Sequence, residues 1–291
     1  MIKLHTFILE SAHTTNNNAQ RRKELEEWLK DKKYPDYVKT LNKMMDDPKA
    51  AVLIKDGFGG DLGNSKFTFS VKKIKAKALR PTQSEIDIDK SLKHALNTPS
   101  NMENDFKKEV IIANMPLVTF RGNYVIDGHH RWAEEAIINP DGKMVCFDYD
   151  NPDISPIQML KAVQASIAAA LVVQKRNNED LPIGITKGQN LYDDEWDKDQ
   201  IREYVEEKLT DICAKIFEKH TGEDAVDTIT NNAVSVKNNQ YPEAGAPNRG
   251  EMPQTDKAGT EKGNKRSSYP DKKDSALYRM RKGKFDSAAV K

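Results

Sequence analysis

One short segment of the chain combines residue types and a spacing that suit phosphate chemistry. It is Asp127-Gly128-His129-His130-Arg131, and it joins a strand-like apolar stretch to a helical pattern. Glycine permits a tight turn and a close backbone approach, while the first-turn amides and the dipole of a helix favour an anion. Arg131 can grip phosphate oxygens through two parallel hydrogen bonds. We therefore expect Gly128, His129, His130 and Arg131 to form a phosphate site.

The residues alone also allow other interpretations of this segment. It can be an ordinary polar turn at the end of a strand, or His129 and His130 can bind a metal ion directly. Adjacent histidines on a turn point in different directions, which disfavours the metal. A glycine-rich loop at 57–63 is interpreted as a hairpin loop, because it lacks the Lys-Ser ending of a P-loop.

Alternating strand and helix patterns surround the segment and must position it. A hairpin is predicted at 116–127, with its turn at 121–123, and Trp132 is expected to anchor the following helix in the core. Further strands are expected at 51–54, 66–71 and 144–149, and helices at 87–96, 132–138 and 155–174. This alternation is typical of an α/β or α+β domain over residues 50–175.

Helical and polar segments flank that domain. An amphipathic helical pair is predicted at 18–46, and one long helix at 197–219, with Ile201, Val205, Leu209, Ile212 and Ile216 facing inward. Residues 236–291 contain 13 Lys or Arg against 7 Asp or Glu and few apolar residues, which predicts a basic, disordered tail. The predicted division is a helical segment at 1–49, the central domain at 50–175, an acidic helical segment at 176–235 and the tail at 236–291.

Composition disfavours several classes of protein. The 291 residues include 46 basic and 45 acidic ones, and no apolar run reaches the roughly 18 residues that span a bilayer. The first ten residues are not expected to form a signal peptide, and Cys146 and Cys213 have neither a metal-ligand spacing nor a disulfide framework. We therefore expect a cytoplasmic protein without membrane contact, and neither a disulfide scaffold nor a zinc finger.

The phosphate segment is part of a longer pattern within about residues 70–175. The pattern consists of Arg80 to Asp87, a helix, Pro116-Leu117-Val118, and Tyr124 to Trp132. It resembles the ParB/sulfiredoxin-like superfamily, and its Asp-Gly-His-His-Arg form is most similar to the free-serine-kinase-like branch and to ParB-like proteins of bacteriophages. The resemblance implies an α+β fold, with a small mixed sheet and packed helices, flanked by N- and C-terminal helices and the disordered tail. It also implies a nucleotide (ATP, ADP or CTP) with Mg²⁺, bound by Arg80 and by the Gly128–Arg131 box.

Within this resemblance the acidic residues are assigned catalytic roles. Phosphoryl transfer needs a carboxylate that orients or deprotonates the acceptor, so Glu85 is assigned as the base. Asp127 is assigned as a Mg²⁺ ligand or as the anchor of His129. His129 is the third residue of the catalytic set, after Glu85 and Asp127. The alternatives are a first-turn carboxylate favoured by the helix dipole for Glu85, and a strand-end turn residue for Asp127.

The chain departs from two branches of the superfamily. Sulfiredoxins have a catalytic cysteine where this chain has His129, and Cys146 is no replacement, so reduction of a sulfinic acid is not expected. Partition-type DNA binding is disfavoured, because residues 179–227 carry 15 acidic against 6 basic side chains and would repel a phosphate backbone.

Three functions are compatible with the pattern. The first is a nucleotide-dependent phosphotransferase or nucleotidase. The second is a non-catalytic, phage-type structural or DNA-associated protein that keeps the ParB-like fold as a scaffold, and the third is a ParB-like nuclease. Besides the nucleotide, the expected partners are a protein bound through helices 18–46 and 197–219, and nucleic acid bound without sequence specificity by the basic tail. The expected location is the cytoplasm of a host cell, or the virion if a phage encodes the chain.

Overall fold

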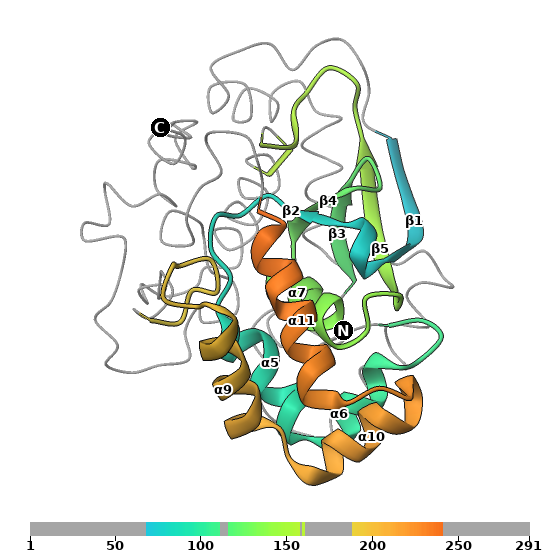
Figure 1. Cartoon of the computed structure of the whole chain (residues 1–291). Coiled ribbons are helices and arrows are strands. Elements are labelled where there is room, and N and C mark those ends of the chain that lie inside the picture. The colour runs from blue at the N-terminus through green and yellow to red at the C-terminus, as the bar shows by residue number, and fades with distance from the viewer. Residues whose placement is uncertain (1–67, 111–115, 158, 161–187, 241–291) are drawn as a thin grey trace, which may run out of the picture.

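The computed structural model describes residues 68–110, 116–157, 159–160 and 188–240 of the chain (Figure 1). Within these ranges it forms a five-stranded mixed sheet and six α-helices, so the predicted α+β class is confirmed. Several predictions lie outside the described residues: the helices at 18–46, the strand at 51–54, the glycine loop at 57–63, most of the helix at 155–174 and the tail beyond residue 240.

The sheet has the strand order β1-β5-β3-β4-β2. β1 (Thr68–Lys75) pairs antiparallel with β5 (Lys143–Asp150), and β5 pairs parallel with β3 (Leu117–Phe120). β3 and β4 (Tyr124–Asp127) form the predicted hairpin, and β2 (Arg80–Pro81) pairs parallel with β4. Because β2 and β4 are parallel, their carboxyl ends meet at one edge of the sheet, and the phosphate segment begins there.

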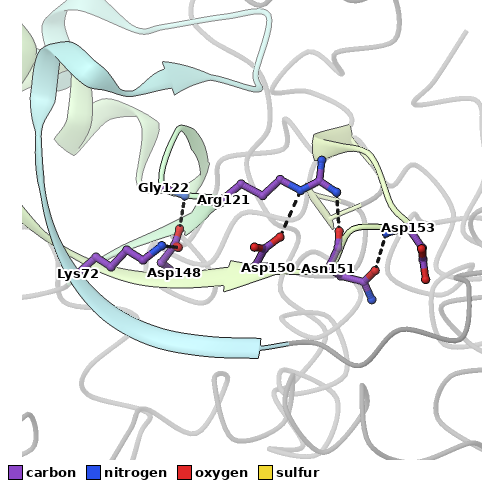
Figure 2. A network of polar contacts seen from close by, with 7 residues as sticks. All are labelled: Lys72, Arg121, Gly122, Asp148, Asp150, Asn151 and Asp153. Atoms are coloured by element: carbon purple, nitrogen blue, oxygen red, sulfur yellow. Dashed lines mark hydrogen bonds and ion pairs between the residues drawn. The ribbon is translucent and has the colours of Figure 1, made fainter.

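The turn of the β3–β4 hairpin is fixed by a buried aspartate on the neighbouring strand. Asp148 of β5 accepts a hydrogen bond of 2.7 Å from the N–H of Gly122, and its other carboxylate oxygen pairs with Lys72 of β1 at 2.6 Å (Figure 2). The hydroxyl of Thr119 donates a third bond of 2.8 Å to Asp148. The carboxylate therefore replaces its lost hydration with three donors, as a buried charge requires.

Arg121 in the same turn has a left-handed backbone, with φ of 54°. An L side chain in this region costs about 1–2 kcal/mol. The guanidinium of Arg121 contacts a carboxylate oxygen of Asp150 at 3.3 Å and the carbonyl of Asn151 at 2.6 Å (Figure 2). These two contacts attach the hairpin tip to the last residue of β5 and to the residue that follows it.

Three helices follow the first strands and pack together. They are α5 (Ile88–Asn97), α6 (Pro99–Asp105) and α7 (His129–Ile138). α7 is buried along nearly its whole length, and the indole N–H of Trp132 donates a bond of 3.0 Å to the carbonyl of Ala76 in the 3-10 turn Ala76–Ala78. Trp132 is therefore the core anchor that the sequence predicted.

Three further helices complete the same hydrophobic core. α9 (Lys198–Lys208), α10 (Asp211–Thr221) and α11 (Ala225–Asn238) contribute buried apolar side chains to the cluster that also contains those of α5 to α7. α11 packs against α7 and α9, and α10 packs against α6 and α5 (Figure 1). None of the helices in the described part of the chain is long and apolar enough to cross a membrane.

The structure corrects three helix boundaries. The long helix predicted at 197–219 is two helices, because the N–H of Thr210 bonds to the carbonyl of Leu96 and the Thr210 hydroxyl caps α10. Ile212, which was predicted to face inward, is 60% exposed. α7 begins at His129 and not at Trp132, and α11 extends to Asn238, beyond the start predicted for the tail.

Candidate functional site

A left-handed glycine connects β4 to α7 at the predicted phosphate segment. Gly128 has a φ of 93°, and its carbonyl accepts the first hydrogen bond of the helix, 2.9 Å from the N–H of Trp132. A Cβ atom on Gly128 would lie 2.7 Å from the Leu117 side chain and 2.5 Å from the Arg131 guanidinium. Both the backbone conformation and the close packing therefore require glycine at this position.

Arg131 folds back over the start of its own helix. Its Nη2 atom lies 3.1 Å from a carboxylate oxygen of Asp127, and only 14% of its side chain is exposed. The guanidinium therefore lies at the amino-terminal end of α7, where the helix dipole also contributes positive potential. An anion that binds at this end has to share Arg131 with Asp127 or displace it.

His129 is turned toward the segment that follows β2. Its Nε2 atom accepts a hydrogen bond of 3.1 Å from the backbone N–H of Thr82 and lies 3.2 Å from the Thr82 hydroxyl. That hydroxyl donates in turn to the carbonyl of Val125 at 2.6 Å. His129 is buried, and the N–H that points at Nε2 identifies this atom as the unprotonated nitrogen of the ring.

His130 makes a corresponding contact at the other end of the same segment. Its Nε2 atom accepts a bond of 3.1 Å from the backbone N–H of Asp87, the residue that caps α5. Residues 82–87 are thus attached to α7 at both ends, by one histidine each. The sequence predicts that both histidines face a phosphate. In the structure their Nε2 atoms bind protein backbone.

Glu85 and Arg80 lie on the stretch that these contacts hold. Glu85 is half-buried within residues 82–87, where its carbonyl accepts a hydrogen bond from the side chain of Gln83. Arg80 begins β2 with its side chain exposed, and its backbone N–H donates a bond of 2.8 Å to the carbonyl of Asn123. Thr82, which sequence reasoning did not single out, is the residue that joins this stretch to His129.

The residues fit a metal only when a nucleotide supplies further ligands. Among the described residues, no group of three or more His, Cys, Asp or Glu is arranged to hold a metal ion. Mg²⁺ is commonly bound by one or two carboxylates together with substrate phosphates and water. Asp127 is half-buried at the helix start and can serve as such a single carboxylate.

Cys146 lies in β5 and is unsuited to redox chemistry. The side chain is buried, and burial together with the nearby Asp148 charge raises the pKa of its thiol to about 12. The thiolate is the reactive form of cysteine, and it is scarce at neutral pH when the pKa is this high.

The structure thus brings most of the predicted site residues to one place. Asp127, Gly128 and Arg131 form the turn into α7, while His129 and His130 bind the stretch that carries Glu85. Comparison with protein-family models, with curated proteins and with solved structures gave no match to this chain. Its function must therefore be inferred from the site itself.

Proposed function

We propose that the chain is a ParB-like protein that binds a nucleotide at the start of α7 and acts as a phosphotransferase or nucleotidase. The observation that carries this proposal is the left-handed Gly128, which turns β4 into α7 beside the carboxyl end of the parallel strand β2. Ligands of sheets with parallel strands bind outside the carboxyl ends of those strands. A helix start at this point favours phosphate in particular.

Arg131 is the side chain that would bind the phosphates. In the free protein its charge is balanced by Asp127 at 3.1 Å. A nucleotide brings several negative charges, and Arg forms bidentate bonds with phosphate oxygens, so it competes well for the guanidinium. Asp127, released from Arg131, would then hold Mg²⁺ together with the phosphate oxygens, and the ion would neutralise charge on the transferred group.

The histidines act as positioning residues in this proposal. Their Nε2 atoms hold both ends of residues 82–87 against α7. This stretch carries Glu85, the carboxylate assigned to orient or deprotonate the phosphoryl acceptor. His129 and His130 therefore determine where the base lies relative to the phosphates.

A non-catalytic scaffold, of the phage-type structural or DNA-associated kind, is the second candidate. It is favoured by the way in which the polar groups of the box satisfy one another, since Arg131 pairs with Asp127 and both histidines accept backbone hydrogen bonds. In this case the box is a structural joint and binds no nucleotide.

Binding measurements separate the two candidates. The melting temperature and the Kd of the full chain are measured with ATP, ADP and CTP, with and without Mg²⁺, because a ligand of the native state raises the melting temperature. Arg131→Ala should weaken binding about 10- to 150-fold, the equivalent of the 1.5–3 kcal/mol of a charged hydrogen bond. The matched control is Arg202→Ala, which removes an arginine that also pairs with a carboxylate four residues away, on α9.

Each outcome selects one interpretation. If no nucleotide changes the melting temperature or binds, the nucleotide proposal is rejected and the scaffold is retained. If Arg131→Ala binds as tightly as Arg202→Ala, the site is not at the start of α7. Glu85→Gln should retain binding but lose phosphate release or transfer, and full turnover in this variant would exclude Glu85 as the base.

A further inference from the structure

Three carboxyl side chains are buried where α6 meets α7. Asp105, at the end of α6, is 1% exposed, and Glu134 and Glu135 of α7 are 8% and 0% exposed. Carboxylates are almost never fully buried in proteins unless a partner compensates their charge. We refer to Asp105, Glu134 and Glu135 as the carboxyl cluster.

No cation in the described part of the chain forms an ion pair with the cluster. Neither carboxylate oxygen of Asp105 or of Glu135 has a hydrogen-bond donor. None of the ion pairs formed by the described residues includes a member of the cluster. Three ionised carboxylates in this position would repel one another and would lack the hydration they have in the unfolded chain.

Several charged groups on the surrounding elements form ion pairs outside the cluster. Arg131, on the same helix, is turned to Asp127. The remaining pairs on the adjacent elements are Lys219 and His220 of α10 with Glu103 of α6, Lys75 and Lys77 with Asp141 of the turn after α7, Lys93 with Asp89 on α5, and Arg202 of α9 with Asp227 of α11. Lys107, just after α6, acts on Asp105 only at a distance.

Burial dominates the titration of all three groups. Burial, together with the negative charges of Asp105 and Glu134, raises the pKa of Glu135 to about 10. Burial also raises the pKa of Asp105 and of Glu134 well above their ordinary values. The side chain of Asn104 and the charge of Lys107 oppose part of the effect at Asp105, and Arg131 opposes part of it at Glu134. Burial therefore favours the protonated form of all three carboxyls.

The cluster also forms the contact between α7 and the turn that leads into β5. A Cβ atom on Gly142 would lie 1.6 Å from a carboxyl oxygen of Glu135, so this carboxyl packs directly on the turn. The side chain of Asn139 donates a bond of 2.8 Å to the carbonyl of Asp105, which joins the same turn to α6. The charge state of the cluster thus acts on three segments together.

We propose that Asp105, Glu134 and Glu135, when protonated, form a contact that holds α6 and the 139–142 turn against α7 near neutral pH. We call this contact the latch, and it weakens as the pH rises. The folded chain keeps protons that the unfolded chain releases, since unperturbed Asp and Glu titrate near pH 4. Stability is therefore full below the unfolded pKa values and is lost as the pH rises toward the folded ones. Each retained proton lowers the folding equilibrium constant tenfold per pH unit in that interval.

Urea unfolding of the full chain at pH 6, 7, 8 and 9 tests the latch. In Glu135→Gln the amide imitates the protonated carboxyl but does not titrate. The factor by which the folding constant falls per pH unit should therefore be about ten times smaller in this variant than in the wild type. Glu203→Gln, which changes an exposed glutamate of α9, should follow the wild-type pH dependence. The latch is refuted if Glu135→Gln and the wild type lose stability in parallel over this range.

A proton count provides a second test that needs no variant. The full chain is refolded from urea by dilution at pH 8 in weak buffer with an indicator dye. We expect net uptake of protons by the wild type, and about one proton less by Glu135→Gln if that variant folds. If the wild type takes up no protons, or if it releases protons, the proposal is overturned even when the variants are unable to fold.

Discussion

Substitution of Gly128 by alanine tests the geometry on which the candidate site depends. The added Cβ atom meets the Leu117 side chain at 2.7 Å and the Arg131 guanidinium at 2.5 Å, and the backbone is left-handed with φ of 93°. Leu117 is buried in β3, and Arg131 is held by Asp127. Neither neighbour can move away without losing its own contacts, so part of the strain should remain.

The cost has two parts that a second glycine separates. The left-handed backbone costs an alanine about 1–2 kcal/mol, and overpacking adds about 1–3 kcal/mol, so Gly128→Ala should destabilise the chain by about 2–5 kcal/mol. Gly222, at the end of α10, is also left-handed, with φ of 75°, but its Cβ atom would meet nothing within 4 Å. Gly222→Ala should therefore cost only the backbone part, about 1–2 kcal/mol.

Urea unfolding followed by circular dichroism measures both values on the full chain, with the free energy of unfolding taken from the midpoint and slope. In a Leu117→Ala background Gly128→Ala should cost less, because one of the two clashing groups is gone, and a double-mutant cycle gives the coupling. Equal costs for Gly128→Ala and Gly222→Ala, or no coupling to Leu117, would refute the packing described for the helix start.

Three further predictions concern other parts of the structure. His129→Ala leaves the buried N–H of Thr82 without its acceptor and should cost about 1–3 kcal/mol of unfolding free energy. The control His94→Ala, at an exposed position, should change this free energy by less than about 0.5 kcal/mol. Similar losses in the two variants would contradict the contact between His129 and Thr82. Thr210→Ala removes the cap of α10 and should cost about 1 kcal/mol in urea unfolding, and an unchanged midpoint would mean that the cap is not needed. The two cysteines are buried with raised pKa values, that of Cys146 to about 12, so a thiol reagent at pH 8 should modify neither in the native chain and both in urea; rapid labelling of the native chain would show that a thiol is accessible.

Features with local causes could be predicted from the sequence. The β3–β4 hairpin, the turn at Gly128 and the core position of Trp132 each have a signal in residues within a few positions of one another, although contacts with Asp148 and Ala76 complete the hairpin turn and the Trp132 site. The strand β5 was predicted within one residue at each end. The start of α7 was placed three residues late, because His129 and His130 do not resemble the opening of an apolar helical stripe.

The orientation of the two histidines depends on contacts that are distant in sequence. Thr82 is 47 residues from His129, and Asp87 is 43 residues from His130. The donors are backbone N–H groups, which every residue except proline possesses. No side-chain pattern could therefore indicate that the imidazoles bind residues 82–87.

The carboxyl cluster could not be predicted because helical patterns assume one face in water. Glu134 and Glu135 are ordinary solvent-facing residues on such a pattern. In the structure α7 is surrounded by α5, α6, α11 and the 3-10 turn at Ala76–Ala78, so it has no solvent-exposed face. The break at Thr210 was missed for a related reason, since the apolar spacing of α9 and α10 continues across it.

The core shared by α5 to α7 and α9 to α11 has a consequence for synthesis of the chain on the ribosome. The apolar surfaces of α5 and α7 are completed by side chains of α9 and α11, including Ile201, Ile229 and Val236. These residues are translated about 70 to 110 positions after α7 begins, so the nascent chain exposes an unfinished core until α11 has left the exit tunnel. Transiently exposed apolar surface promotes aggregation, and a ribosome stalled before residue 238 should therefore carry a chain that chaperones bind.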